Sequence, residues 1–406
     1  MKINEYKHFL NECKHEYKVM EFIRKTALDN GYELFDENKE YQQNDKIIFE
    51  FNKLIALIAL GKDLEKDGAN MIISHMDSPR LDVIPNDPFL EKEDGVFCKV
   101  TPYGGIISQS WLDRPLVLIG KAYNKNGEVF INTEKNKIFF TISSLLPHLD
   151  GRQEMNNLKY EKLIVRMGHD VIKKIKQKYK LTKEDLQFAD LSFVPAGEAY
   201  NVSFDKELIA GYGHDDRSCV FAELRAMMNS KENDKTKIAL FTSYEETGSG
   251  QSSGAESEVI DDIFLELLGT QKAARRSMRK CKMISADVCA GFESNYNTHF
   301  EENCKVIVGE GLGIVPFLGG KCGNDATPEM RNFIKDLCTN NNIKYQIETT
   351  KVGERGGGTV STFFGIKGIN VIDCGVPVLA MHSPQELINK KDLEAAYKLY
   401  KVFFES

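Results

Sequence analysis

The sequence lacks the features of several common protein classes. Among its 406 residues there are one tryptophan, no low-complexity tract and no apolar run longer than the strand-sized "LIALIALG". A membrane-spanning helix needs about 20 apolar residues, so no span is predicted. Lysine and arginine (53) are outnumbered by aspartate and glutamate (60), and the formal charge is −7. The chain therefore has no basic excess that would attract nucleic acids or anionic membranes, and we expect neither as a partner.

A disulfide framework and a secretory signal are missing as well. The nine cysteines are odd in number and form no CxxC pair. The N-terminal stretch, "MKINEYKHFLNECKHEYK", is charged throughout and lacks the apolar core of a signal peptide. Reduced thiols in a cytoplasmic compartment are the simplest account of both observations.

The order of elements predicts an α/β fold. An amphipathic helix is expected to end near Asn30-Gly31, and the apolar stretches on either side of Asn52 predict a β-hairpin. After about Tyr212, strands such as "KIALFTS", "CKMISADV" and "INVIDCGV" alternate with helices such as "DDRSCVFAELRAMMNS" and "SEVIDDIFLELLG". This alternation predicts a mainly parallel mixed sheet with helices on both faces, to which the strand before His75 also belongs.

A stretch of different character interrupts this pattern. Apolar and polar residues alternate between turn signals such as Lys125-Asn126-Gly127, and a charged helical stretch runs from Ile164 to Gln187. The alternation favours antiparallel strands, and the length of the chain exceeds what one core usually serves. The predicted domains are a discontinuous α/β domain of residues 1–86 and 211–406, and an inserted β-rich domain of residues 87–210.

Five short stretches place a histidine or a carboxylate directly after an apolar strand or on a loop beside one. They are "IISHMDSP", "GYGHDDRSC", "FTSYEETGSG", "ISADVC" and "VLAMHSPQE". In an open α/β sheet, the loops at the carboxyl ends of the strands converge on one crevice. The side chains that could meet there are His75, Asp215, Glu245, Glu246, Asp287 and His382.

Imidazoles mixed with carboxylates suit divalent zinc, with cobalt or manganese as alternatives. The set is large enough for two divalent ions if one carboxylate bridges them and if both ions hold a shared water, which would be the nucleophile. The adjacent pair Glu245-Glu246 then has an explanation, since one glutamate can bind metal while its neighbour takes the proton from that water.

The same five stretches, in this order, resemble the M18 family of metallo-aminopeptidases, the aspartyl aminopeptidase and aminopeptidase I group. "VPAGEAYNVSFDKELIAGYG" and "GGGTV" also match its bacterial branch, so the resemblance covers nearly the whole chain. It implies a zinc exopeptidase-like fold, removal of the N-terminal residue from peptides, and two metal ions. It also implies that the inserted domain mediates dimer contacts and that dimers build a tetrahedral dodecamer.

The resemblance also implies a role for each residue. His75 and Asp287 would bind one ion, Glu246 and His382 the other, and Asp215 would bridge them. Asp77 would hold His75 from behind, and Glu245 would be the general base. His148, in "LLPHLDG", would correspond to a histidine of the inserted domain that reaches the site of a neighbouring subunit.

The chain departs from the family pattern beside the substrate. Aspartyl-specific members resemble "AHAVHPNY" after the metal-binding aspartate, whereas this chain has "CAGFESNY". The sequence therefore does not decide whether an N-terminal Asp or Glu is preferred. "GKCGNDATPE" and "ERGGGTV" would line the substrate side, where Lys321 or Arg355 would read an acidic side chain and Gly357 would lie beside it.

Each motif alone also has a structural reading. A histidine after a strand is often only hydrogen-bonded, adjacent acids often start a helix, and an aspartate pair can cap one. Two other functions remain open: a related dinuclear amidohydrolase or carboxypeptidase, and a non-catalytic oligomeric scaffold on the same fold. Cleavage of a peptide with a free amine, but not of a blocked one, separates the first alternative from an aminopeptidase.

Overall fold

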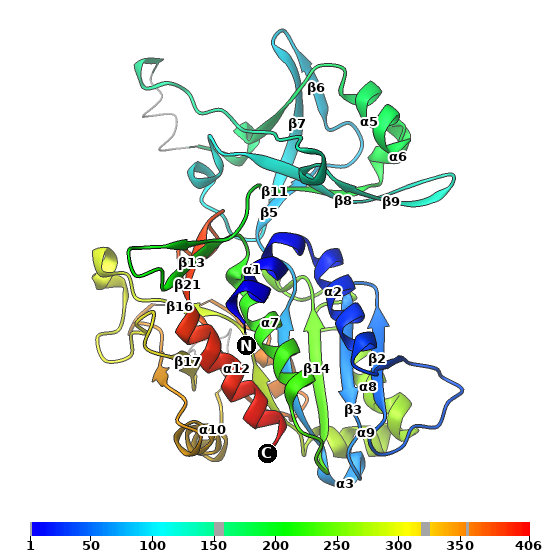
Figure 1. The fold of residues 1–406 in the computed structure, drawn as a ribbon, viewed down its shortest axis with the longest axis vertical. Coiled ribbons are helices and arrows are strands. Elements are labelled where there is room, and N and C mark those ends of the chain that lie inside the picture. Colours follow the sequence, from blue (N-terminus) through cyan, green and yellow to red (C-terminus); the bar gives the residue numbers. More distant parts are fainter. Residues whose placement is uncertain (1, 150–157, 318–324, 355–356) are drawn as a thin grey trace. The chain divides into compact units, whose positions relative to one another are not determined.

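The computed structural model describes residues 2–149, 158–317, 325–354 and 357–406. Its contacts divide the chain into two compact units (Figure 1). The first unit comprises Met1–Asp77, Ala199–Met381 and Glu386–Ser406, and the second comprises Ser78–Glu198 and His382–Gln385. Among the described residues, no helix has the length and apolar character needed to cross a membrane.

The first unit is built on a nine-stranded mixed sheet, and four strands in its middle, β14, β4, β15 and β19, run parallel. The strands, in spatial order, are β1 (Glu33–Leu34), β2 (Lys46–Phe51), β3 (Leu54–Ala59), β14 (Thr236–Thr242), β4 (Ala69–His75), β15 (Lys282–Ser285), β19 (Asn370–Gly375), β17 (Leu312–Val315) and β18 (Tyr345–Ile347). The predicted hairpin around Asn52 is confirmed, because β2 and β3 pair antiparallel.

Helices cover both faces of this sheet, because its central strands are apolar on both sides. On β4, Ile72 packs into one core, while Met71 and Ile73 pack into the other. The first core takes residues from α1 (Ile3–Glu12), α2 (Glu16–Asp29), α7 (His214–Asn229), α10 (Pro328–Asn340) and α12 (Lys390–Phe404). The second takes residues from α3 (Leu64–Asp67), α8 (Val259–Leu268), α9 (Gln271–Met278) and α11 (Ser361–Gly365). The predicted sheet with helices on both faces is therefore confirmed.

A second, smaller sheet of the first unit was not predicted, because its strands are too short to show alternation. It contains β12 (Tyr200–Val202), β13 (Leu208–Gly211), β21 (Glu386–Asn389), β20 (Pro377–Leu379) and β16 (Cys289–Ala290). β13 leads into α7, and β16 follows β15, so this sheet adjoins the segments that carry the candidate site residues.

The second unit is rich in antiparallel strands, as its alternation predicts. Its seven-stranded sheet contains β10 (Ile164–Gly168), β7 (Gly95–Tyr103), β5 (Arg80–Val83), β11 (Asp190–Pro195), β8 (Leu116–Asn124), β9 (Gly127–Asn132) and β6 (Phe89–Lys92). Among the described residues, this unit also has two short α-helices, α5 (Val171–Tyr179) and α6 (Lys183–Gln187).

Two predicted helices are wrong in extent. The N-terminal helix is in fact two helices, α1 and α2, and the side chain of His15 caps α2 by accepting a hydrogen bond from the backbone N of Tyr17. The helix predicted from Ile164 to Gln187 begins instead as strand β10 and then forms α5 and α6, with Asp170 and Lys180 in left-handed conformations at the ends of α5. Both predicted stretches are charged along their whole length, so their residues show no clear sign of the break between α1 and α2 or of the change from β10 to α5.

Candidate metal centre

Three neighbouring parallel strands end at the same edge of the main sheet. His75 is the last residue of β4 and pairs with Thr242, the last residue of β14. On the other side of β4, β15 ends at Ser285, two residues before Asp287. The register therefore brings the loops after all three strands together, as the sequence predicts for parallel strands.

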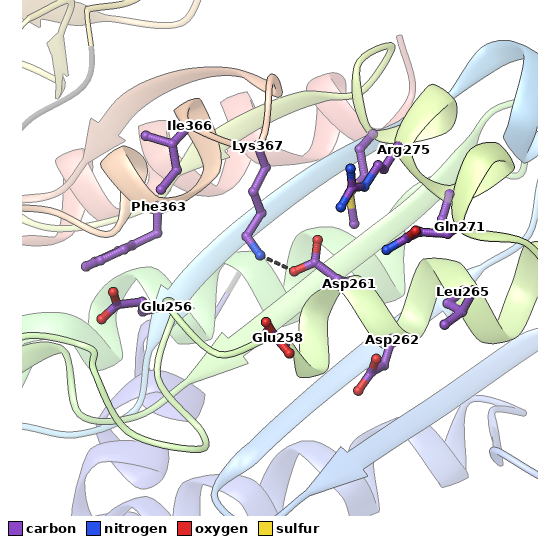
Figure 2. Close-up of a pocket in the computed structure, with 12 residues that line it drawn as sticks. Glu256, Glu258, Asp261, Asp262, Leu265, Gln271, Arg275, Phe363, Ile366 and Lys367 are labelled. Carbon is purple, nitrogen blue, oxygen red and sulfur yellow. Dashed lines mark hydrogen bonds and ion pairs between the residues drawn. The ribbon is translucent and has the colours of Figure 1, made fainter.

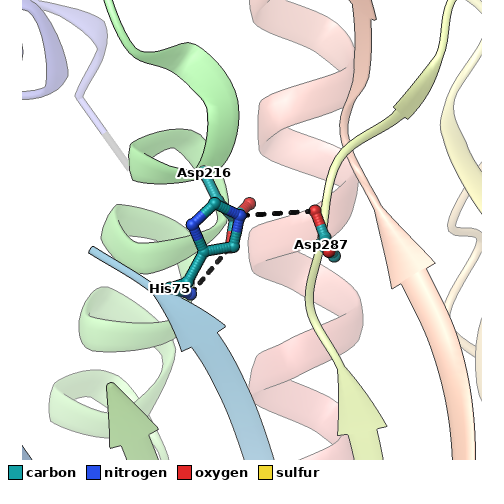
Figure 3. Close-up of side chains that lie close together, drawn as sticks. All are labelled: His75, Asp216 and Asp287. Carbon is teal, nitrogen blue, oxygen red and sulfur yellow. Dashed lines mark hydrogen bonds and ion pairs between the residues drawn. The ribbon is translucent and has the colours of Figure 1, made fainter. Parts of the chain in front are cut away.

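His75 is almost fully buried (2% exposed), and carboxylates surround its ring. Its Nε2 lies 3.2 Å from Oδ1 of Asp215 and 3.7 Å from Oδ1 of Asp287. Asp215 comes from the first turn of α7, and Asp287 from the loop after β15. Figure 3 shows His75 and Asp287 facing each other, with Asp216 beside them.

Asp216 is a member of this cluster that the sequence analysis did not assign. Its Oδ2 accepts a hydrogen bond of 3.1 Å from the backbone N of His75. One possible ligand atom from each of His75, Asp216 and Asp287 lies within 4.8 Å of the other two. The only sequence signal was its place as the second residue of "DD"; the peptide bond between Asp215 and Asp216 is cis. Asp216 Oδ1 is buried without a hydrogen-bond partner among the described residues.

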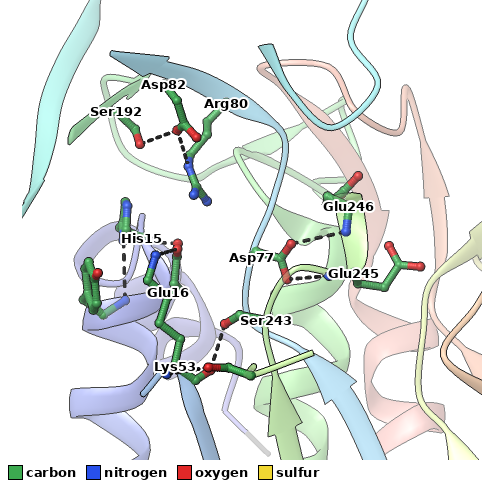
Figure 4. A network of polar contacts seen from close by, with 12 residues as sticks. His15, Glu16, Lys53, Asp77, Arg80, Asp82, Ser192, Ser243, Glu245 and Glu246 are labelled. Atoms are coloured by element: carbon green, nitrogen blue, oxygen red, sulfur yellow. Dashed lines mark hydrogen bonds and ion pairs between the residues drawn. The ribbon is translucent and has the colours of Figure 1, made fainter. Parts of the chain in front are cut away.

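Asp77 links the histidine to the glutamate loop. The Nδ1 of His75 lies 3.1 Å from the carbonyl O of Asp77 and 3.4 Å from its Oδ1. The two carboxylate oxygens of Asp77 also accept hydrogen bonds from the backbone N of Glu245 (3.4 Å) and of Glu246 (3.2 Å), as Figure 4 shows. One buried carboxylate thus orients both the imidazole and the Glu245-Glu246 turn.

Asp215 connects Glu246 with the rest of the cluster. Carboxylate oxygens of Asp215 and Glu246 lie within 4.8 Å of each other, and the backbone N of Asp215 donates a 3.0 Å hydrogen bond to Oε2 of Glu386. Glu386 is buried (1% exposed) and is a further residue that the sequence analysis did not assign. Its signal was its position at the end of "AMHSPQE".

His382 lies in the four-residue segment that groups with the second unit. Within that unit, its Nδ1 is 2.8 Å from the carbonyl O of Gly105. The chain connects the segment at both ends to the first unit, through Met381 and Glu386. The role of His382 as a ligand remains a prediction.

Burial, and after it the neighbouring carboxylates, raise the pKa of the acids in this cluster. Burial is the largest cause for Asp216, Asp287, Glu245 and Glu246, and it raises the pKa of Glu245 to about 8. Burial alone would lower the pKa of His75, but its contacts with Asp215, Asp287 and Asp77 outweigh burial and raise it.

This donor set suits a divalent metal. A cation would offset the repulsion among the buried carboxylates, because a bound dication is the largest charge in its site. An imidazole with several carboxylates is a typical ligand set for zinc.

The remaining predicted site residues are His148, Gly357, Lys321 and Arg355. His148 is exposed, in the short 3-10 helix Pro147–Leu149 of the second unit. Gly357 is exposed, and a Cβ added to it would meet no atom within 4 Å. Lys321 and Arg355 lie outside the described residues.

A cavity of about 460 Å³ lies elsewhere on the first unit, between α8, α9 and the segment that carries Phe363 and Lys367 (Figure 2). Four acids line it, and one of them, Asp261, forms an ion pair with Lys367. None of its lining residues belongs to the His75 cluster, so the presence of a cavity does not by itself identify the metal centre.

Comparison with known proteins shows which family the chain belongs to. Residues 9–404 match the family described as aminopeptidase I zinc metalloprotease (M18). The "Probable M18 family aminopeptidase 1" of Borreliella burgdorferi is 35% identical over 98% of this chain and 94% of its own. An M18 aminopeptidase from Thermotoga maritima has the same fold, with a TM-score of 0.93 and 30% identity over 99% of this chain and 95% of that chain.

A more distant structure, the mApe1 dodecamer of S. cerevisiae, covers 99% of this chain and 96% of its own at 19% identity and a TM-score of 0.83. That likeness shows the fold alone. The family match over residues 9–404 and the 35% identical relative show the family as well. The chain belongs to the M18 family of zinc metalloproteases and is a metallo-aminopeptidase.

Proposed function

We propose that this aminopeptidase holds two divalent ions at the carboxyl edge of its main sheet. His75 and Asp287 bind one ion, Glu246 and His382 bind the other, and Asp215 lies between the two sets. The observation that carries the proposal is the position of Asp215, which faces His75 Nε2 at 3.2 Å and also lies within 4.8 Å of Glu246. One carboxylate can thus serve both sets.

The ions, zinc being the expected metal, supply Lewis acidity, which lowers the pKa of a water molecule and polarises the scissile carbonyl. Glu245 accepts the proton of the attacking water at a carboxylate oxygen and then delivers it to the leaving amine. Burial favours the protonated form of Glu245, and nearby dications counteract that preference. Asp77 fixes the orientation of His75 and of the glutamate turn, so it acts by position and not by proton transfer.

The substrate is a peptide with a free N-terminus. Acidic oxygens near the ions that do not bind metal would attract its α-ammonium group. A preference for an acidic first residue would come from Lys321 or Arg355, with Gly357 leaving room beside the side chain. Rates with Asp, Glu, Leu and Ala at the first position measure this preference directly.

The second unit serves assembly. We infer dimers formed through this unit and a dodecamer built from the dimers, with His148 of one subunit completing the site of a neighbour. Support comes from exposed apolar side chains near His148, including Leu146 (49% exposed) and Leu149 (62%), since such patches mark interfaces. A dodecamer is known for the yeast relative. The eight described cysteines are free, which supports a reducing compartment such as the cytoplasm.

A pair of matched peptides tests the activity. The purified protein, with zinc counted per chain, is offered a peptide with a free N-terminus and the same peptide acetylated. We expect release of the first residue from the free peptide alone, with two ions per chain. Cleavage of the acetylated peptide, or release of the last residue, would point to an amidohydrolase or carboxypeptidase. Full activity at one ion per chain would refute the dinuclear site, and no hydrolysis at two ions would favour a scaffold.

A further inference from the structure

The loop that carries Glu245 is held from a second side, away from Asp77. Lys53 lies in the turn between β2 and β3 and is buried (7% exposed), which is unusual for a lysine. A buried ammonium group is costly unless it is paired, so its contacts indicate what the residue does. These contacts lead to the glutamate loop along two routes, one through the backbone of Lys53 and one through its side chain. Figure 4 shows Lys53 with two of its partners, Ser243 and Glu16.

The backbone of Lys53 forms hydrogen bonds with both ends of the loop from Ser243 to Ser253. Its N donates a 3.0 Å hydrogen bond to Oγ of Ser253, and its carbonyl O accepts a 2.9 Å hydrogen bond from Oγ of Ser243. The N of Ser243 in turn donates to the carbonyl O of Ser253 at 3.0 Å. The segment from Ser243 to Ser253 is therefore clamped at its base by one residue of the neighbouring hairpin.

The side chain of Lys53 reaches the start of the glutamate turn. Its Nζ pairs with Oε1 of the buried Glu16 at 2.8 Å. The same ammonium lies 4.6 Å from the ring centroid of Tyr17 and 5.3 Å from that of Tyr244. A cation within about 6 Å of an aromatic face is attracted to it, and more strongly where water is excluded. The ion pair with Glu16 thus holds a cation against the ring of Tyr244.

Tyr244 is the residue whose backbone directs the glutamates. Its φ of +66° lies in the left-handed region, which a tyrosine seldom adopts without support from its surroundings. Its carbonyl O accepts a 2.8 Å hydrogen bond from the N of Ser249, which closes the turn over Glu245 and Glu246. With this conformation at Tyr244, the N–H groups of both glutamates point toward Asp77.

We propose that Lys53 is a positioning residue for the reaction. Through its ammonium on the ring of Tyr244 and its backbone on Ser243 and Ser253, it holds the turn in the conformation that places Glu245. This role rests on the proposed function of Glu245 as the general base. Lys53 itself touches neither substrate nor metal in the proposal.

The test compares Lys53→Met with Lys53→Arg at saturating zinc, with zinc per chain measured for each. We expect Lys53→Met to lower kcat by about 10²-fold, with KM nearly unchanged, since a misplaced catalytic group affects the chemical step. Lys53→Arg keeps a cation near the ring and should recover most of the loss. Lys237→Met is the matched control: it removes another buried lysine (4% exposed) in β14, bonded to Ser230 at 3.1 Å, and should leave kcat unchanged.

A double variant separates positioning from general destabilisation. If Lys53 acts through Glu245, then Lys53→Met should cost little further activity in a Glu245→Gln background, because the two changes remove the same function. An equal loss in both backgrounds, or no loss in Lys53→Met alone, would overturn the proposal. If Glu245→Gln alone leaves kcat unchanged, the proposed general base fails first, whatever Lys53 does.

A second variant keeps the test valid if Lys53→Met folds poorly. Should Lys53→Met fold poorly because Glu16 loses its cation, Glu16→Gln/Lys53→Met removes both charges and is assayed instead. The same about 10²-fold loss of kcat is expected from it, since the cation on the Tyr244 ring is gone in both. Wild-type kcat in the folded double variant would refute the role.

Discussion

His75 of the first unit and His148 of the second unit have opposite surroundings. In the first unit, His75 is 2% exposed and lies among the carboxylates of Asp77, Asp215, Asp216 and Asp287. In the second unit, His148 is exposed, in a stretch whose leucines are exposed as well. Of these two histidines, His75 is surrounded by carboxylates of its own unit, whereas His148 is exposed.

This difference separates two kinds of functional residue. A cluster at the ends of paired strands is determined by sheet register, so the chain builds it alone. An exposed histidine beside exposed apolar side chains needs a further surface before it can act. If so, the buried cluster binds metal within one chain, whereas His148 acts only in the assembled oligomer.

The largest expected effect comes from removing the central imidazole. His75→Ala should abolish both zinc binding at the first position and peptide hydrolysis, because the first ion loses its imidazole ligand and too few donors remain to hold it. Zinc per chain by elemental analysis, together with the rate of hydrolysis, checks this. His8→Ala, which removes an exposed histidine of α1, is the control and should behave as wild type. Full zinc occupancy in His75→Ala would exclude His75 as a ligand.

A smaller loss is expected from the neighbouring glutamate turn. Glu245→Gln keeps the size of the side chain but removes its proton-accepting carboxylate, so kcat should fall by about 10²- to 10⁴-fold while zinc stays bound. Glu266→Gln, an exposed change on α8, serves as the control. A Glu245→Gln enzyme that keeps the wild-type rate would assign the base elsewhere, and one that loses zinc would make Glu245 a ligand.

His148 tests the other side of the comparison. If it completes a neighbour's site, His148→Ala should lower kcat by about 10²-fold, the scale of losing one group that stabilises the transition state, with zinc content unchanged. His169→Ala, also exposed in the second unit, should have no such effect. Mixing His148→Ala subunits with Glu245→Gln subunits should restore part of the activity, since mixed assemblies pair an intact turn with an intact histidine. Absence of any recovery would mean that His148 does not act across subunits.

The parts of this molecule that were predictable from sequence follow the same division. Strands β4, β14, β15 and β19 and helix α7 were predicted because their apolar periodicity is strong and their burial depends on the chain alone. The grouping of His75 with Asp215 and Asp287 followed from placing loops at strand ends. Asp216 and Glu386 were not predicted. Nothing in the sequence tells that both adjacent aspartates are buried against His75, or that a buried glutamate accepts a hydrogen bond from the backbone N of Asp215.

The smallest expected effect concerns a buried acid behind the site. Glu223 of α7 is fully buried, and its carboxylate accepts hydrogen bonds from Ser74 Oγ and, at 3.0 Å, from the N of Leu240. Burial, the largest cause, raises its pKa well above the usual range. The folded protein therefore holds this proton more tightly than the unfolded chain does. The resulting stability is complete below the pKa of the unfolded chain, about 4.3, and is lost as the pH rises toward the folded-state value.

Glu223→Gln places a permanently neutral group of the same size there, and its amide can keep partners at Leu240 and Ser74. We expect the variant to gain free energy of unfolding relative to wild type as the pH is raised from about 4 to 8, with little difference at the acid end. Urea unfolding at both pH values measures the change, and zinc content and kcat should remain those of the wild type. A gain confined to low pH would mean that Glu223 is ionised in the fold. In that case the first unit would tolerate buried carboxylates without metal, and the crowding around His75 would lose its value as a sign of a bound cation.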